Sequence, residues 1–118
     1  MKKSLVFFIL IILSMTAIVG CSSVSYKNVT SDQAKTLLED STYILLDVRT
    51  TEEYRDNHVP GSILIPVQEL ELRLDELDKD KKYLVLCRSG NRSVTASEIL
   101  IEHGFGYVYN VMGGINQW

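Results

Sequence analysis

Residues 83–93 read YLVLCRSGNRS, a continuous apolar run followed directly by a cysteine and a short polar loop. An apolar run without alternation is typical of a strand that is buried on both faces of a parallel sheet. A second run of this kind, residues 43–46, ends in Asp47-Val48-Arg49. Segments with helical spacing lie between such runs. The sequence therefore predicts an α/β fold with a central, mainly parallel sheet and helices on both faces.

Local signals predict where the other elements begin and end. Capping-box spacings at 30–33 and 50–53 predict two helix starts, and the second helix should stop near Asn57. Two further strands and two further helices are predicted at 62–65, 107–111, 67–77 and 93–103. Gly104 should end the last of these helices. In a parallel sheet, ligands bind beyond the carboxyl ends of the strands, where Asp47 and Cys87 both stand.

The first 20 residues have the pattern of an export signal. Two lysines, Lys2 and Lys3, precede an apolar run that is too short for a typical transmembrane helix. The end of that run, Ile18-Val19-Gly20-Cys21, resembles the lipobox of bacterial lipoproteins. The resemblance implies cleavage before Cys21 and a lipid on its sulfur, which would hold the protein on a bacterial membrane, outside the cytoplasm. An uncleaved signal anchor is the alternative, with the same exported location.

These features divide the chain into a signal peptide (1–20), a lipidated cysteine with a short tether (21–25) and one domain (26–118). Without Lys2 and Lys3, the chain carries 10 basic and 15 acidic side chains. Such an acidic chain, which has no Lys/Arg-rich tract, argues against a nucleic-acid partner. If Cys21 carries a lipid, Cys87 is the only free thiol, and a disulfide within the chain is excluded.

The loop after Cys87 combines features that activate a thiol. Gly90 can take a positive φ, which suits a tight turn. If the loop curls, its backbone N–H groups point at the sulfur, and the next helix start, Arg88 and Arg92 add positive charge. All of these favour the thiolate, which is the nucleophilic form of cysteine. The alternative is a cysteine that only ends a core strand, since free cysteines are commonly buried.

The segment Cys87-Arg88-Ser89-Gly90-Asn91-Arg92-Ser93 resembles the active-site loop of single-domain rhodaneses. Other signatures of that family occur in the same order along the chain, namely Asp47-Val48-Arg49, Glu53-Tyr54, residues 58–62, Ile65-Pro66, Gly113-Gly114-Ile115 and Trp118. The resemblance implies a rhodanese-like fold. It also implies transfer of sulfane sulfur through a persulfide on Cys87, from thiosulfate or a related donor to a thiol or cyanide. It implies no metal and no organic cofactor, because sulfur itself is the group carried.

The resemblance also implies a set of substrate-binding loop residues: Arg88, Ser89, Gly90, Asn91, Arg92 and Ser93. We expect Arg88 at the rim of the loop, where a sulfonate-bearing donor would meet it. Arg92 should brace the loop from inside or cap the next helix. Asp47 is expected to have a structural role beside Arg49. For Arg49 three roles stay open: pairing with Asp47, reaching toward an anionic substrate, and lying solvated at the surface.

Loop length separates two kinds of chemistry. Four residues lie between Cys87 and Arg92, whereas related phosphatases and arsenate reductases use a loop that is one residue longer and fits a tetrahedral oxyanion. The shorter loop favours a single sulfur atom as cargo. A persulfide carrier, which holds sulfur on Cys87 without turning over thiosulfate, is the alternative from the binding class. We expect a monomer.

Overall fold

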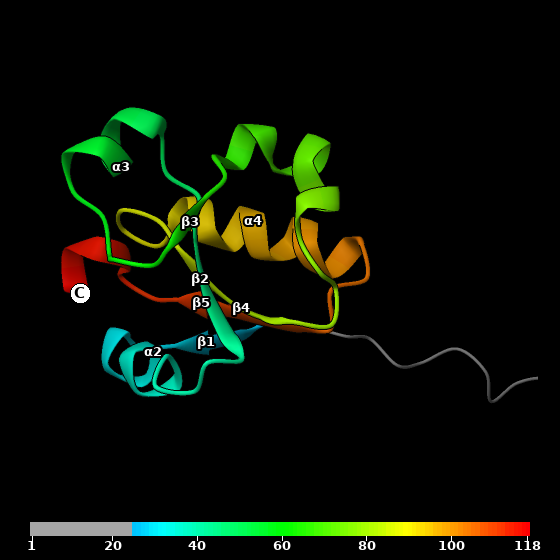
Figure 1. The fold of residues 1–118 in the computed structure, drawn as a ribbon, viewed down its shortest axis with the longest axis horizontal. Coiled ribbons are helices and arrows are strands. Elements are labelled where there is room, and N and C mark those ends of the chain that lie inside the picture. The colour runs from blue at the N-terminus through cyan, green and yellow to red at the C-terminus, as the bar shows by residue number, and fades with distance from the viewer. Residues whose placement is uncertain (1–24) are drawn as a thin grey trace, which may run out of the picture.

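The computed structural model describes residues 25–118, which form one five-stranded parallel sheet (Figure 1). The strands are β1 (Lys27–Val29), β2 (Tyr43–Asp47), β3 (Ile63–Leu64), β4 (Lys82–Leu86) and β5 (Tyr107–Val111), and their order in the sheet is β1-β5-β4-β2-β3. Each neighbouring pair is parallel. The predicted signal peptide, the lipidation at Cys21 and residues 21–24 of the tether lie outside the described residues.

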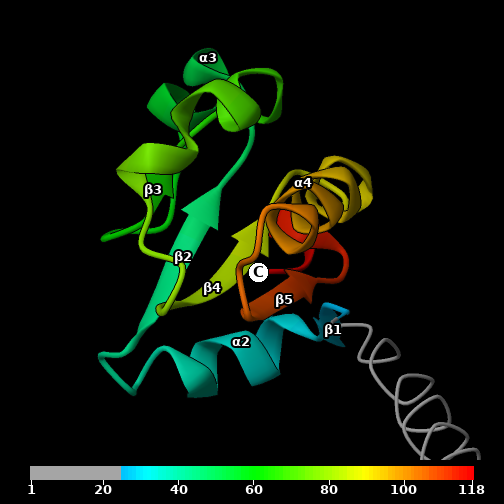
Figure 2. The ribbon, with the colours of Figure 1, turned by 90° about the vertical axis from the view of Figure 1, so that its right-hand side faces the viewer.

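Helices cover both faces of this sheet, as predicted. The helical elements are α2 (Ser31–Leu37), α3 (Thr51–Asp56), the 3₁₀ segment η2 (Val67–Glu76), α4 (Asn91–Glu102) and the 3₁₀ turn η3 (Gly114–Gln117). Figure 2 shows α2 on one side of the strands, with α3, η2 and α4 on the other side. Within residues 25–118, no helix combines the length and the apolar character needed to cross a bilayer.

The two faces bury separate apolar clusters because neighbouring strand residues point to opposite sides. In β2, Leu46 packs in the cluster under α4 and η2, whereas Leu45 packs in the cluster under α2 and η3. In β4, Val85 packs in the cluster under α4 and η2, and Leu84 packs in the cluster under α2 and η3. This division explains why residues 43–46 of β2 and 83–86 of β4 form continuous apolar runs, since each face of these strands is covered by a helix.

Both predicted capping boxes are present. The Gln33 amide N–H donates to Thr30 Oγ1 (3.1 Å), and the Thr30 N–H donates to Gln33 Oε1 (2.9 Å). The second box joins Thr50 and Glu53 in the same reciprocal way, with both bonds at 3.2 Å. Because each box satisfies two N–H groups that a helix start leaves free, it fixes where the helix begins.

Three elements differ from the predictions. Strand β1 was not predicted, because only one of its three residues, Val29, is buried. Residues 67–76 form a 3₁₀ helix with a break at Arg73, and the apolar spacing of three and four that predicted this helix fits both helix types. The last helix begins at Asn91, two residues before the predicted start at Ser93, because Gly90 at φ 106° ends the loop there.

The strand order creates one crevice at the carboxyl edge of the sheet. From β2 the chain moves outward to β3, and from β4 it moves the other way to β5. Connections that diverge from neighbouring strands leave a gap between their carboxyl ends, which is where ligands bind in open α/β sheets. Asp47 at the end of β2 and Cys87 just after β4 stand at this gap, as the sequence predicted.

Candidate active site

The Cys87 side chain is enclosed by the loop that follows it. Cys87 is only 1% exposed, although it immediately follows β4 at the open edge of the sheet. The Gly90 N–H donates to its Sγ (3.0 Å), and Ser93 Oγ lies 3.3 Å from the same atom. Gly90 can turn its N–H inward because its φ of 106° suits glycine. The predicted curled loop, with backbone N–H groups directed at the sulfur, is therefore present.

Two opposing effects set the pKa of the Cys87 thiol. Burial raises the pKa, because it disfavours the charged thiolate. Hydrogen bonds to the sulfur from the Ser93 hydroxyl and from the N–H groups of Ser93, Gly90 and Ser89 lower it. The hydrogen bonds outweigh burial, so the pKa of Cys87 lies below the usual value for a thiol. The loop thus favours the nucleophilic form of the cysteine.

The two loop arginines have different surroundings. Arg92 forms a bidentate pair with Glu53 of α3, with nitrogen–oxygen distances of 2.7 and 2.9 Å. The hydrogen bonds from Arg92 lower the pKa of Glu53 to about 2, so this carboxylate stays charged at neutral pH. Arg88 is exposed, and it forms no ion pair with any residue from 25 to 118. Arg92 thus braces the loop, which is one of the two roles expected for it, and its charge is paired with Glu53.

Glu53 belongs to the site, although the sequence predicted it only as a helix cap and as part of a family signature. Its side chain accepts from the Thr50 N–H at the start of α3 and also binds Arg92, which lies 39 positions further along the chain. It therefore ties α3 to the first turn of α4. The sequence feature that drew attention to Glu53 was the Glu53-Tyr54 signature. This signature indicates family membership but does not predict which residue the Glu53 side chain contacts.

Asp47 and Arg49 form a buried pair, which confirms the structural role expected for Asp47. Arg49 Nη2 lies 2.7 Å from Asp47 Oδ2, and the Arg49 Nε lies 3.0 Å from both carboxylate oxygens. The same Nη2 donates to the Asn57 carbonyl (2.7 Å), at the end of α3. Because Arg49 is 4% exposed and its Nε and Nη2 are both held in these bonds, the structure favours the pairing role over the solvated and the substrate-binding ones. The pair joins the end of β2 to α3.

Residues after β5 hold the cysteine loop from behind. The N–H of Ile115 donates to the Cys87 carbonyl (2.8 Å), and the N–H of Asn116 donates to the Arg88 carbonyl (3.1 Å). A Cβ atom on Gly114 would lie 2.5 Å from both of these carbonyl oxygens. Only glycine allows so close an approach, and φ at Gly114 is 58°. The glycine at position 114 of the Gly113-Gly114 signature is thus explained by its close approach to the backbone of Cys87 and Arg88. This contact depends on the three-dimensional fold and cannot be predicted from the local sequence.

The two histidines satisfy backbone groups away from the sulfur. His58 Nδ1 lies 2.8 Å from the Tyr54 carbonyl, and its ring stacks on the Tyr54 ring with centroids 3.9 Å apart. His103 Nδ1 lies 2.8 Å from the Ile99 carbonyl in the last turn of α4. Among residues 25–118, no group of three or more potential metal ligands comes together. Within residues 25–118, this geometry offers an activated thiol, Cys87, and an arginine without an ion-pair partner, Arg88, at the rim of its loop.

Comparisons with known proteins agree with this geometry. The family model "Rhodanese-like domain" matches residues 30–118. The thiosulfate sulfurtransferase GlpE of Pseudomonas syringae is 34% identical over 93 residues, which cover 79% of this chain and 87% of that protein. The putative sulfur carrier protein YrkF of Bacillus subtilis is 39% identical over 79 residues, which cover 67% of this chain but only 43% of YrkF. This chain therefore spans less than half the length of YrkF.

A solved structure confirms the fold class. The rhodanese-related protein of Thermoplasma volcanium superposes with a TM-score of 0.72 and 36% sequence identity, covering 79% of this chain and 90% of that one. The α/β architecture with a parallel sheet and helices on both faces is thus shared with a protein that is described as rhodanese-related.

Replacing Gly114 with alanine should destabilise the protein strongly. The new Cβ would clash with the Cys87 and Arg88 backbone and would sit at a positive φ, so we expect a loss of about 2–4 kcal/mol in the free energy of unfolding. Urea denaturation followed by circular dichroism measures this. Gly106→Ala is the matched control, because nothing lies within 4 Å of a Cβ there, and it should change stability little. Equal stability of the two variants would contradict the steric account.

Replacing Ser93 with alanine should shift the ionisation of Cys87 to higher pH. The Ser93 hydroxyl is the largest of the effects that lower the pKa of the thiol, so its loss leaves burial less opposed. The rate of iodoacetamide alkylation, measured as a function of pH on the peptide that contains Cys87, reports the thiolate fraction. The control is Ser89→Ala, which removes an exposed hydroxyl and keeps the backbone N–H. If the two variants show the same pH profile as the parent, the hydroxyl does not stabilise the thiolate.

Proposed function

The chain belongs to the rhodanese-like domain family, and from this premise we propose that it transfers sulfane sulfur from thiosulfate or a related donor to a thiophilic acceptor. The observation that carries the proposal is the Cys87 sulfur, enclosed by the Gly90 N–H and the Ser93 hydroxyl with its pKa lowered. The relatives named as thiosulfate sulfurtransferase and as putative sulfur carrier support the same class of function.

In the loading step the Cys87 thiolate attacks the outer sulfur of thiosulfate. The sulfur–sulfur bond of the donor breaks, sulfite leaves with the electron pair, and a persulfide anion remains on Cys87. Arg88 is placed to hold the sulfonate part of the donor, because it is the exposed arginine of the loop and has no ion-pair partner among residues 25–118. The loop N–H groups would stabilise the persulfide anion as they stabilise the thiolate.

In the discharge step an acceptor thiolate or cyanide attacks the outer sulfur of the persulfide. The bond between the two sulfurs breaks, and its electron pair returns to Cys87 as thiolate. A new bond forms between the acceptor and the transferred sulfur, so the enzyme ends as it began. The protein groups that these two proposed steps use belong to the loop of residues 87–93.

A persulfide carrier without efficient turnover is the second candidate. The carrier is favoured by the very low exposure of Cys87, since a buried sulfur slows the capture of a small dianion from solution. An oxyanion enzyme is disfavoured, because Arg92 donates to Glu53 with both terminal nitrogens. That arginine is therefore not free to clamp a phosphate or an arsenate.

The sequence before residue 25 supports a membrane-anchored location for this activity. We infer that Cys21 carries lipid and that the domain is held outside the cytoplasm by the tether. The described part of the chain starts beside β1 at the amino edge of the sheet, whereas the Cys87 loop stands at the carboxyl edge (Figure 1). An anchor at Cys21 would therefore leave the loop facing away from the bilayer, open to soluble donors and acceptors.

Treatment with thiosulfate should add the mass of one sulfur atom to the parent protein and none to Cys87→Ser. Intact-mass spectrometry measures the adduct, and the production of thiocyanate from thiosulfate and cyanide measures turnover. An adduct with steady turnover supports the enzyme, whereas an adduct with negligible turnover supports the carrier. Sulfur transfer by Cys87→Ser at the parental rate would eliminate both.

Replacing Cys21 with serine should release the protein from the membrane, because serine cannot accept the thioether-linked lipid. Fractionation of cells that express the full chain, followed by immunoblotting, measures the distribution. Retention of Cys21→Ser in the membrane at the parental level would instead indicate an uncleaved signal anchor. The control is Ser22→Ala, which alters the tether and keeps the cysteine.

A further inference from the structure

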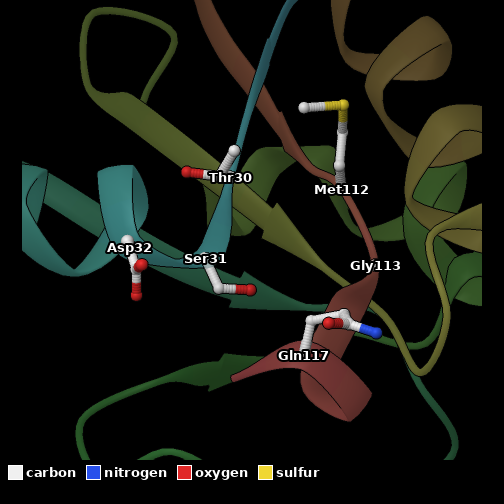
Figure 3. A pocket seen from close by; sticks show the side chains of 6 residues that line it. All are labelled: Thr30, Ser31, Asp32, Met112, Gly113 and Gln117. Carbon is white, nitrogen blue, oxygen red and sulfur yellow. The ribbon is translucent and has the colours of Figure 1, made fainter.

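The two ends of strands β1 and β5 carry different kinds of side chain. Figure 3 shows the cavity of about 380 Å³ at their carboxyl ends, which is lined by Thr30, Ser31, Asp32, Met112, Gly113 and Gln117. None of these six residues is aromatic or basic. The amino ends of the same strands begin instead with Lys27 and Tyr107.

Strand register places three tyrosines and two lysines together at the amino edge of the sheet. Tyr43, Lys82 and Tyr107 are aligned across β2, β4 and β5. Lys27 of β1 is aligned with Tyr109 of β5. Tyr43 and Tyr109 pack in the cluster under α2, and side chains alternate along a strand, so the other three residues point to that same face. We call these five residues the amino-edge patch.

The aromatic and basic side chains of the amino-edge patch lie close to one another. The ring centroids of Tyr43 and Tyr109 are 5.6 Å apart, and Lys82 Nζ lies 4.9 Å from the Tyr43 centroid. Among residues 25–118, neither lysine of the patch forms an ion pair. Asp40 lies near Lys82 and Glu39 precedes it, so the patch and these two acids together carry no net charge. Residues 25–118 as a whole, by contrast, carry 10 basic and 15 acidic side chains.

The tether leaves the domain from within this patch. Ser25, the first described residue, helps to line a hollow of about 200 Å³ with Lys27, Tyr107 and Tyr109. The Tyr107 side chain is 49% exposed. Cys21 precedes Ser25 by four positions, so the chain between them spans at most about 14 Å when extended.

This length of chain indicates what covers the patch. Each headgroup layer of a bilayer is about 5–8 Å thick, so an anchor at Cys21 brings the amino edge to the lipid surface. Tyrosine suits this depth because its ring is apolar and its hydroxyl is polar, and lysine can bury its stem while its ammonium stays in water. So short a tether also gives the patch a high effective concentration at the surface, so that a weak contact can persist.

We propose that the amino-edge patch lies in the headgroup layer of the membrane that anchors the chain, with lipid phosphates on its lysines and its tyrosine rings beside the upper acyl groups. The proposal rests on the membrane attachment proposed before residue 25 and adds a second contact with the same membrane. The anchor alone leaves the domain free to turn about the tether. The patch would hold it in one orientation, with the Cys87 loop on the side away from the bilayer.

A tryptophan placed in the patch tests whether the patch enters the lipid. The full chain is purified from the membrane fraction and reconstituted in vesicles of phosphatidylethanolamine and phosphatidylglycerol, with or without phospholipid that is brominated near the headgroup end of its acyl chains. Bromine quenches nearby tryptophans. The fluorescence that Tyr107→Trp adds to that of the parent should be quenched about two- to threefold more than the fluorescence that Leu72→Trp adds. Leu72 is the matched control because it is 85% exposed and belongs to η2, on the other face of the sheet (Figure 2).

Removing one lysine tests the contact with lipid phosphates. Lys27→Gln, combined with Tyr107→Trp, should lower this quenching, whereas Arg55→Gln in the same background should not. Arg55 is an exposed cation of α3, on the face of the sheet that is turned away from α2. Unchanged quenching in Lys27→Gln would overturn the role given to the lysine.

The same samples separate this inference from the proposed anchor. Equal quenching of Tyr107→Trp and Leu72→Trp, in chains that float with the vesicles, would overturn the membrane contact of the patch and leave the anchor intact. A parental chain that does not float with the vesicles would overturn the anchor and this contact with it. Sulfur uptake by Cys87 is measured independently of both, so the proposed chemistry stands or fails by itself.

Discussion

The approach of Gly114 to the backbone of Cys87 and Arg88 is the constraint on which the active-site loop depends. The N–H groups of Ile115 and Asn116 bind the two carbonyls behind the loop, so its opposite side is left to face the sulfur. This contact is possible only because β5 is the neighbour of β4 in the sheet, which brings the segment after β5 beneath the loop. Sheet order, a glycine and two backbone hydrogen bonds thus preorganise the N–H groups around Cys87 before any substrate arrives.

Preorganisation matters here because the sulfur is buried. Removing a thiolate from water raises the pKa of its thiol, and an enclosed cysteine without donors would be inert. The donors to Cys87 reverse this effect only while the loop keeps its curl. Two ion pairs fix the loop's surroundings: Glu53–Arg92 ties α3 to α4, and Asp47–Arg49 ties β2 to the end of α3. Arg49 and Arg92, which a charge count would assign to the substrate, therefore support the scaffold, and only the proposed contact between Arg88 and a donor remains for the loop.

The sequence predicted the features that depend on neighbouring residues. Two capping boxes, the buried strands and the turn at Gly90 all follow from local spacing, and the structure confirms them. The pairing of Arg92 with Glu53 joins residues 39 positions apart, and the contact of Gly114 with Cys87 depends on strand order, so neither has a local signal. Strand β1 was missed for a related reason: its place is fixed by pairing with β5, whereas its own three residues show no apolar pattern.

The surroundings of Cys87 also differ in charge from side to side, which bears on how one sulfur atom could be received and passed on. Within residues 25–118, Arg88 at the loop rim has no ion-pair partner, whereas Arg92 at the other end of the loop is neutralised by Glu53. An anionic donor would therefore be attracted to the rim and not to the start of α4. The same fixed charge would act on the donor before transfer and on the released sulfite after it, so it would position the anion without changing the equilibrium of the reaction. The loop thus separates the positioning of an anion, which falls to Arg88, from the stabilisation of the sulfur, which falls to the Ser93 hydroxyl and the N–H groups of the loop.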